Sequence, residues 1–345
     1  MMSVRINRVM QPLPEVSVII PARNEEACIG SCLASLAAQS GVDFEILVID
    51  DNSTDKTADI ARSFRGVSVI SAGPLPVGWT GKSHALTMGL PFARGTLLLF
   101  TDADTVHLAG SLADSVRTFR EKGLSLLSYS PQQDAYGLAE KLVQPIIFAE
   151  LDRVYSFAAI NDMQCPLAAA NGQYILVDRK TYEEVGGHGA VRTAILEDVE
   201  LAKLFKRANK RIWFGSGTGR VRARMYSGFA DMWEGWSKNL ALLFKRPLLL
   251  AVIRFAEFCT VLVTAVVALT PHQHFFVRAL SVVVLLGTIL AFWKRVHNTT
   301  FSPLDKMVSL LGLPIFVGLL VNSYLQLRIF KKISWKDRTY ATPGD

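Results

Sequence analysis

Short apolar runs alternate with stretches of helical periodicity over the first hundred residues. Four runs are short and rich in β-branched residues or leucine, as buried strands are: residues 16–20, 44–50, 67–71 and 96–100. Three stretches between them have helical spacing: residues 24–39, 54–64 and 83–93. In the first stretch, Ile29, Leu33 and Leu36 recur at i, i+4 and i+7. The alternation predicts an α/β fold, with a mostly parallel sheet covered by helices on both faces.

The last third of the chain has a different pattern, because it contains three long apolar runs. They cover residues 247–270, 277–293 and 307–327. Each is near the roughly 20 residues that a membrane-spanning helix needs. The mean hydropathy of +0.28 is high for a wholly soluble protein. We therefore expect a globular domain at 1–245, a membrane domain of two to three apolar helices at 246–330, and a basic tail at 331–345.

Basic residues flank these apolar runs: Lys238, Lys245, Arg246, Lys294, Arg295, Lys331, Lys332, Lys336 and Arg338. Three full crossings would place the basic tail on the opposite side from the basic large domain, against the tendency of Lys and Arg to stay inside. One run is therefore expected to be re-entrant or interfacial. Pro314 interrupts the third run, the second is short, and Arg254 and Glu257 lie within the first, about one helical turn apart, where they could pair. The residues alone leave this choice open.

Charge and cysteine content indicate which partner and which compartment to expect. The formal net charge is +7, which suits either nucleic acid or anionic lipid, and the position of the charges beside apolar runs favours the membrane and not nucleic acid. No apolar stretch of signal-peptide length precedes residue 16, so the large domain is expected to be cytoplasmic, attached to a membrane of the bacterial inner type by a multi-pass segment. Cys28, Cys32, Cys165 and Cys259 lack paired metal spacing, and Cys28 and Cys32, four apart on one face of an expected helix, are expected to be packing residues.

Acidic and amide side chains directly follow three of the expected strands, in "PARNEE", "DDNSTD" and "TDADT". The carboxyl ends of parallel strands share one edge of a sheet, where the binding crevice lies. No G-x-G-x-x-G follows these strands, and "GWTGKSHAL" has Pro76 where a P-loop needs glycine. The like charges of Asp102 and Asp104 are tolerable side by side if a divalent cation neutralises them. Hard oxygen ligands suit Mg²⁺ or Mn²⁺ held jointly with substrate phosphates.

Five segments occur in an order that resembles a known family: "VSVIIPARNEE", "LVIDDNSTDKT", "GKSHAL", "FTDADT" and "LEDVEL". Together they are similar to family 2 inverting glycosyltransferases with the GT-A fold. Within that family they resemble the membrane-attached, lipid-modifying branch related to hopanoid-associated, carotenoid and ceramide glycosyltransferases. The resemblance covers roughly residues 14–245. Each motif alone is weak, whereas the five in order are specific.

The resemblance implies a set of donor-binding residues: Pro21, Arg23, Glu25, Asp50, Asp51, Lys82, Asp102 and Asp104. Asp51 would accept from the uracil imide, with Asp50 supporting the loop. Lys82 would reach the ribose or the diphosphate, and Asp102 the ribose or the sugar. Asp104 would be the metal ligand of the D-x-D motif, holding Mn²⁺ or Mg²⁺.

The resemblance also implies a catalytic base, Asp198 in "LEDVE". Inversion in a single displacement needs a carboxylate that takes the acceptor's proton, while the metal stabilises the leaving diphosphate. An acid stabilised by the helix dipole is the structural alternative for Asp198. The acceptor-binding residues would be Glu197, Trp236 and Lys238.

One departure from the family pattern concerns the stretch before the first apolar run. Many processive members carry Q-x-x-R-W there, whereas this chain has "FADMWEGWSKNL", which favours a single transfer. For Trp236, anchoring at the membrane interface competes evenly with stacking on the acceptor. For Lys238, as for Lys245 and Arg246, lipid-facing charge is favoured over a contact with diphosphate.

Two further segments are expected to shape the acceptor side. Residues 137–160 are apolar but carry Glu140, Glu150 and Asp152, so they predict an interfacial or acceptor-lining helix. Small residues at 168–172 run into a strand at 174–177 and could form the floor of a pocket for a bulky lipid head.

The leading functional hypothesis is transfer of one hexose from a UDP-sugar to a lipid hydroxyl or carboxyl group. A second enzyme hypothesis is transfer to a polyprenyl phosphate from a different nucleotide sugar. A different class is a nucleotide-binding sensor or transporter with a degenerate transferase domain. Intact Asp51, Asp104 and Asp198 argue against degeneracy, and three apolar runs are few for a transporter.

Overall fold

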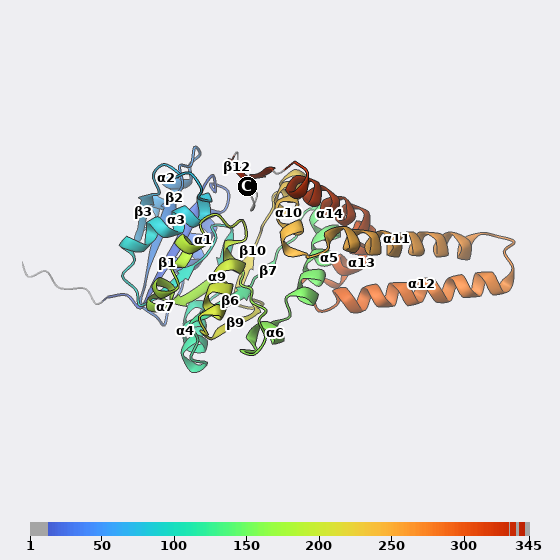
Figure 1. Cartoon of the computed structure of the whole chain (residues 1–345), viewed down its shortest axis with the longest axis horizontal. Helices are drawn as coiled ribbons and strands as arrows, with labels where there is room; N and C mark the ends of the chain where they lie inside the picture. Colours follow the sequence, from blue (N-terminus) through green and yellow to red (C-terminus); the bar gives the residue numbers. More distant parts are fainter. Residues whose placement is uncertain (1–12, 331, 336–337, 342–345) are drawn as a thin grey trace, which may run out of the picture.

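A seven-stranded sheet forms the centre of the N-terminal part of the molecule (Figure 1). The structure is a computed structural model that describes residues 13–330, 332–335 and 338–341. The strands, in spatial order, are β3 (Val67–Ser71), β2 (Phe44–Asp50), β1 (Val16–Ala22), β4 (Leu97–Phe100), β8 (Ile175–Asp178), β6 (Leu126–Ser130) and β9 (Ile212–Ser216). β8 runs antiparallel to both of its neighbours, and the other pairs are parallel. The expected mostly parallel α/β sheet is therefore confirmed.

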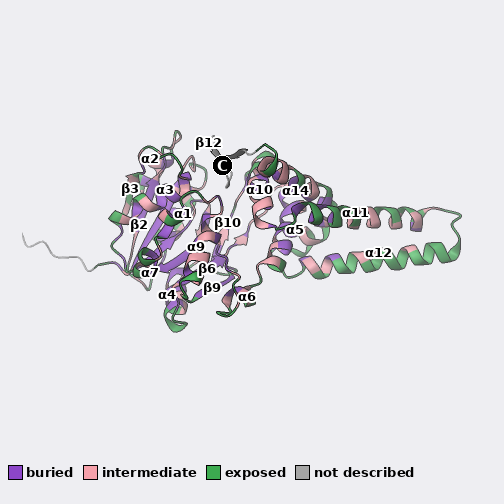
Figure 2. Cartoon of the chain, viewed as in Figure 1, coloured by how far each residue is buried: buried purple, intermediate pink, exposed green. Residues whose placement is uncertain are grey.

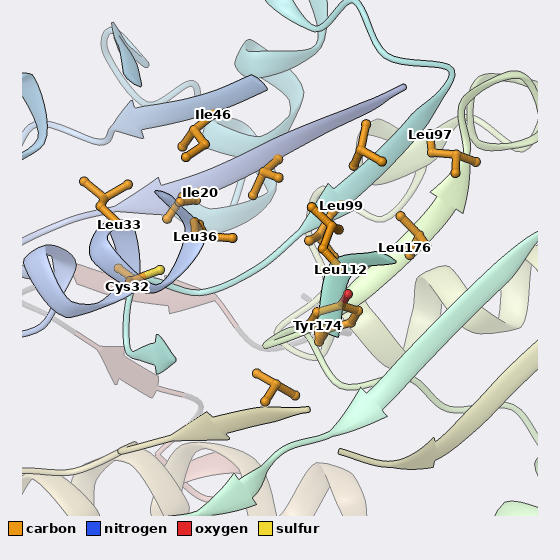
Figure 3. Close-up of a cluster of buried hydrophobic side chains, with 14 of the residues drawn as sticks. Ile20, Cys32, Leu33, Leu36, Ile46, Leu97, Leu99, Leu112, Tyr174 and Leu176 are labelled. Atoms are coloured by element: carbon orange, nitrogen blue, oxygen red, sulfur yellow. The ribbon is translucent and has the colours of Figure 1, made fainter. Parts of the chain in front are cut away.

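Helices cover both faces of this sheet, because successive strand residues point to opposite sides. One face packs against α1 (Ile29–Ala37), α2 (Thr57–Ser63) and α4 (Ser111–Glu121). Figure 3 shows this core, with Cys32 and Leu33 of α1 near Ile20 and Ile46 of the sheet. The other face packs against α3 (Gly81–Gly89), α6 (Phe157–Asn161), α7 (Arg179–Glu184), α8 (Gly187–Ala190) and α9 (Glu197–Arg207). None of the four cysteines forms a disulfide, and Cys32 is a buried packing residue as expected.

The helices after β1 and β2 begin later than periodicity predicts, at Ile29 instead of residue 24 and at Thr57 instead of residue 54. The residues before α1 form the loop after β1, and they hydrogen-bond to the loop after β2, which precedes α2. The Glu25 amide donates to the Thr57 hydroxyl over 2.7 Å, and the Thr54 amide donates to Asn24 Oδ1 over 2.8 Å. Asn24 takes the left-handed conformation at φ 52°, which Asn tolerates better than most residues. These contacts hold the carboxyl ends of β1 and β2 together.

A smaller, three-stranded sheet has the order β5 (Thr105–His107), β10 (Val221–Ala223) and β7 (Gln132–Gln133). The 3-10 turn η1 (Leu90–Phe92) follows α3. β11 (Lys332–Trp335) and β12 (Arg338–Ala341) pair antiparallel near the end of the chain. The basic side chains of the predicted tail at 331–345 lie outside the described residues.

A third apolar core joins the remaining helices, which are α5 (Leu138–Val154), α10 (Phe229–Leu243), α11 (Pro247–Leu269), α12 (Phe275–Val296), α13 (Pro303–Val308) and α14 (Leu313–Arg328). α11 and α12 extend from this core as a long hairpin (Figure 1), and their surface is largely exposed (Figure 2). Within the described residues, three helical segments are long and apolar enough to cross a membrane: Pro247–Leu269, Phe275–Val296 and Pro303–Arg328.

The third of these segments is not one straight helix. The 3-10 turn η2 (Ser309–Gly312) separates α13 from α14. At this turn the chain approaches α5 so closely that a Cβ on Gly312 would lie 2.0 Å from the Leu142 carbonyl oxygen. The interruption of the third run, expected at Pro314 from the sequence, therefore lies just before that residue, at η2, where the chain packs closely on α5.

Candidate active site

A cavity of about 710 Å³ lies between the carboxyl edge of the large sheet and helices α5 and α10. Of the residues singled out from the sequence, eleven line it: Pro21, Arg23, Glu25, Asp51, Lys82, Asp102, Asp104, Glu197, Asp198, Trp236 and Lys238. They come from the end of β1, from the loops after β1, β2 and β4, from the N-termini of α3 and α9, and from α10. Residues far apart in the chain therefore meet at one hollow, as the strand order predicts.

Asp50 is the exception, since it is not part of the cavity wall. Its Oδ1 accepts a hydrogen bond from the Ser53 amide over 3.2 Å, which shapes the loop after β2. Beside it, Arg23 Nη1 donates to the Asp51 carbonyl over 2.9 Å, and the Asp51 amide donates to the Ala22 carbonyl over 2.8 Å. Asp50 therefore contacts the loop and not the cavity, and Asp51 is held firmly at the wall.

Lys82 lies at the centre of the carboxylate cluster. It is in the first turn of α3, where the Thr80 hydroxyl caps the helix by accepting from the Ser83 amide. Its Nζ lies 2.7 Å from Asp102 Oδ1 and 3.2 Å from Glu197 Oε1. Burial opposes its charge, but these two carboxylates outweigh burial and raise the pKa of Lys82 above its usual range. Lys82 is therefore cationic, and its charge in turn holds the pKa of Glu197 below its ordinary value despite burial.

Asp198 lies one residue further along α9, and both of its carboxylate oxygens accept hydrogen bonds. Oδ2 accepts from the Gly172 amide over 2.8 Å, and Oδ1 accepts from the Val199 amide over 2.8 Å. Burial, and then the charge of Glu197, raise the pKa of Asp198 to about 6, although Lys82 opposes the shift. The group is ionised at neutral pH and is more basic than an ordinary aspartate, which suits proton transfer. Asp198 is also in the first turn of α9, where the helix dipole stabilises an acid. This position is compatible both with that structural role and with the expected role as a base.

Gly172 permits this close assembly. A Cβ at this position would lie 2.6 Å from Lys82 Nζ, 3.3 Å from Glu197 Oε1 and 3.5 Å from Asp198 Oδ2. The backbone just before β8 therefore passes directly over the charged cluster, and only glycine leaves room for it. The sequence indicated these residues as a pocket floor, and residues Ala169 to Gln173 do line the cavity.

Asp104 has a partner that the sequence did not indicate. Gln173 Nε2 lies 3.3 Å from Asp104 Oδ2. Gln133 in turn donates to Gln173 Oε1 over 3.2 Å, which fixes the orientation of the amide. No group of three or more His, Cys, Asp or Glu side chains that could hold a metal occurs among the described residues. Asp104 thus offers hard carboxylate oxygens, but a cation there would need most of its ligands from a bound molecule or from water.

Helices α5 and α10 add an apolar part to the cavity wall, beside the polar side chains of Asp152, Lys238 and Asn239. Phe148 and Leu151 contribute from α5 and Tyr155 from its C-cap, and the Tyr155 hydroxyl donates to the Leu243 carbonyl of α10 over 3.1 Å. Residues 137–160 were expected to form one interfacial or acceptor-lining helix; the structure divides them into α5 and α6, and residues of both line the cavity. The cavity therefore joins a charged chamber to an apolar one.

Two residues of α10 are placed differently from the expectation of membrane contact. Trp236 is only 3% exposed, packed between Tyr226 and Phe148, so anchoring at the membrane interface is excluded for it. Lys238 lines the cavity, where burial lowers its pKa although Glu197 opposes the shift. The lipid-facing interpretation of Lys238 was therefore wrong, because the helix turns this residue toward the carboxylates. Lys245 and Arg246 are exposed.

The layered sheet, with acidic loops at its carboxyl edge, is a GT-A fold. A mannosyltransferase from Pyrobaculum calidifontis, solved in complex with GDP-Man and Mn²⁺, superposes with a TM-score of 0.56 at 17% identity, over 92% of this chain and 88% of that one. Residues 17–186 match the family model described as glycosyl transferase family 2. This region of the chain therefore belongs to glycosyl transferase family 2.

Relatives match nearly the whole chain. A 4,4'-diaponeurosporenoate glycosyltransferase of Staphylococcus haemolyticus is 28% identical over 341 residues, covering 94% of this chain and 88% of the relative. A protein of the same description from Staphylococcus aureus (strain USA300) is 26% identical over 334 residues, with the same coverage. The similarity thus extends beyond the sheet domain into the apolar helices.

Replacing Gly172 by Ala should disable the cluster without unfolding the protein. The new methyl group would displace the Lys82 ammonium, the mobile end of a flexible side chain, so the glycosyl transfer rate should fall by about 10- to 100-fold. The melting temperature should stay close to that of the wild type. Gly30→Ala is the matched control, because its Cβ would meet only Ile60 at 3.6 Å, and it should retain full activity. A fully active Gly172→Ala enzyme would show that the placement of Lys82 is unimportant.

Proposed function

We propose that the protein is a metal-dependent, inverting glycosyltransferase that moves one sugar, from a UDP-hexose, to a membrane lipid. One observation carries the proposal. A single cavity unites Asp51, Lys82, Asp104 and Asp198 with the apolar wall made by α5 and α10. A water-soluble, phosphate-bearing donor fits the charged chamber, and a hydrophobic acceptor fits the apolar one.

The donor would lie along the loops after β1, β2 and β4. Asp51, next to Arg23, is positioned to accept from the imide of uracil, and Pro21 and Glu25 complete that wall. The Lys82 ammonium would meet the ribose or the diphosphate, and Asp102 the ribose or the sugar. Asp104 would contribute the protein ligand to Mn²⁺ or Mg²⁺, which when bound supplies charge that stabilises the leaving diphosphate.

The reaction proposed is one displacement at the anomeric carbon. The acceptor oxygen attacks as the bond between that carbon and the diphosphate oxygen breaks. Asp198 takes the proton of an acceptor hydroxyl, and the nucleoside diphosphate leaves with the bonding electron pair. Glu197, Trp236 and Lys238 lie beside Asp198 or on the cavity wall toward α10, where they would orient the acceptor.

A lipid acceptor is supported by two independent features. The relatives are named for transfer to diaponeurosporenoate, a carotenoid acid. The chain also carries helices that could cross a membrane, directly after the helix that closes the cavity. We therefore assign residues 1–245 to a cytoplasmic catalytic domain and 246–330 to membrane attachment.

The Asp198→Asn variant tests the base. It keeps the size of the side chain but cannot accept a proton, so transfer to a lipid hydroxyl should fall by about 10²- to 10⁴-fold while UDP binding stays unchanged. Glu200→Gln is the control on the same helix, because Glu200 pairs with Lys203 and does not line the cavity. Rates with lipid extract and UDP binding by calorimetry are the measurements. Unchanged transfer by Asp198→Asn would remove the base assignment, and a wild-type protein that binds UDP without any transfer would be a sensor.

The pH profile of the wild-type enzyme should have an acid limb set by Asp198. Its pKa is raised to about 6, so the carboxylate loses its charge at a higher pH than an ordinary aspartate would. The turnover rate should be constant above that pH and should fall about tenfold per pH unit below it. Asp152, a second cavity carboxyl whose burial raises its pKa to about 6, serves as the control. Asp152→Asn should keep the limb, and a limb that vanishes in this variant would assign it to Asp152.

Metal binding should depend on the donor, because the described residues contain no three-ligand metal group. UDP should tighten Mn²⁺ binding by about 10- to 100-fold, and Mn²⁺ should tighten UDP binding by the same factor. Titration calorimetry with each ligand alone and with both measures this coupling. Excess EDTA should abolish transfer and added Mn²⁺ or Mg²⁺ should restore it. Transfer that persists in EDTA would contradict a role for the metal.

A further inference from the structure

The hairpin of α11 and α12 presents an apolar surface of bilayer thickness. Its large exposed side chains include Leu248, Leu249, Val252, Ile253, Phe255, Leu262, Val263, Val266 and Leu269 on α11, and Phe275, Phe276, Leu280, Val283, Leu286, Ile289 and Leu290 on α12. At 1.5 Å per residue, Leu248 to Leu269 rises about 32 Å and Phe275 to Trp293 about 27 Å. Both lengths are close to the roughly 30 Å of a bilayer's hydrocarbon core.

Polar residues bound this surface at both ends. At the tip, His272, Gln273 and His274 are exposed in the loop that joins the two helices. At the base, Lys245, Arg246 and Lys294 are exposed beside the rest of the protein. An apolar band between two polar ends is the pattern of a pair of helices that crosses a membrane and returns.

The two charged residues of α11, Arg254 and Glu257, point away from the lipid side and belong to an ion cluster. We define this cluster by its four members, Glu150, Arg254, Glu257 and Arg295. Arg295 Nη2 lies 2.6 Å from Glu257 Oε1. Arg254 pairs with Glu257 on its own helix, as expected from their spacing, and its Nε lies 3.3 Å from Glu150 Oε1. The Glu150 side chain is fully buried. The charges therefore compensate one another against α5, and they do not prevent α11 from facing lipid on its other side.

The third apolar segment is used for packing within the protein. Asn322 of α14 donates to the Ser237 hydroxyl of α10 over 2.7 Å, and the Ala241 amide donates to the Ser323 hydroxyl over 2.8 Å. α14 has 16 residues, so it rises about 24 Å and is shorter than a bilayer core. Trp236 and Lys238, on either side of Ser237 along α10, line the cavity. After α14 the chain continues into β11, which contacts α10 beside the sheet domain (Figure 1).

We propose that the protein crosses the bilayer twice, through α11 and α12 only, and that α13 and α14 stay on the side of the catalytic domain. The loop at 270–274 then lies alone on the far side, and the described parts of the chain before α11 and after α12 lie with the sheet domain. The exposed basic residues Lys245, Arg246 and Lys294 then lie on the side of the catalytic domain, and the chain after α14 no longer has to end on the opposite side, which removes the conflict that three crossings create. Arg278, in the first turn of α12, lies near the tip. Glu150 links the hairpin to α5, so the ion cluster also fixes the apolar end of the cavity at the membrane surface. This topology is independent of the chemistry in the cavity.

Single cysteines report the side on which each segment lies. Gln273→Cys marks the tip, Asn298→Cys the loop after α12, and Asp345→Cys the end of the chain. Gln273 and Asn298 are exposed, so neither substitution removes a packed side chain. Sealed cells that express each full-length variant are treated with a membrane-impermeant maleimide, before and after permeabilisation, with the wild type as the background for the native cysteines.

Two crossings predict that Gln273→Cys is labelled in sealed cells at least about tenfold above wild type, as expected for a site in water on the far side. Asn298→Cys and Asp345→Cys should stay at the wild-type level until the cells are permeabilised. Labelling of both Gln273→Cys and Asp345→Cys in sealed cells would mean that α14 crosses. Protection of all three would mean that the hairpin does not cross. Either pattern would overturn the proposal, and neither depends on whether the protein transfers sugar.

Discussion

The Lys82 ammonium is the interaction on which the candidate site depends. It joins Asp102, from the loop after β4 and partly exposed, to Glu197, which is buried at the start of α9. Carboxylates that approach one another in such a place would protonate or separate without a cation between them. The ammonium keeps Glu197 charged, and the charge of Glu197 in turn raises the basicity of Asp198. One cation thus gives neighbouring carboxylates different proton affinities, as a donor site beside a base requires.

Much of the sheet and of its acidic edge could be predicted from the sequence, because the spacing of apolar residues along the chain encodes the strands. The strands expected at 44–50 and 67–71 have those same bounds in the structure. Parallel strands also dictate that the loops after them meet, so the sequence alone assigns Asp51, Asp102 and Asp104 to one edge of the sheet.

The parts that could not be predicted are contacts between distant segments. Gln173 orients toward Asp104 from 69 residues away, and its own orientation depends on Gln133. No periodicity records such a partner. The side of α10 that Lys238 occupies was also misjudged, since a lysine before an apolar run looks the same whether it faces lipid or a cavity. The break at η2 follows from backbone packing on α5, which a hydropathy pattern does not contain.

Helix α5 connects the two halves of the molecule. Phe148, Leu151 and Tyr155 line the apolar chamber, while Glu150, on the same helix, belongs to the buried ion cluster at the base of the hairpin. A helix that is fixed on one side by charge and lines a cavity on the other has little freedom to move alone. The position of the acceptor chamber is therefore set by the same contacts that attach the hairpin.

The most direct test of the account is an experimental structure with Mn²⁺ and a non-hydrolysable UDP-hexose analogue. We expect the metal between Asp104 and the diphosphate, the Lys82 ammonium against the donor, and the Asp198 carboxylate on the face of the anomeric carbon opposite the diphosphate. A sugar directed away from Asp198, or a nucleotide bound outside the cavity that Lys82 organises, would contradict the account.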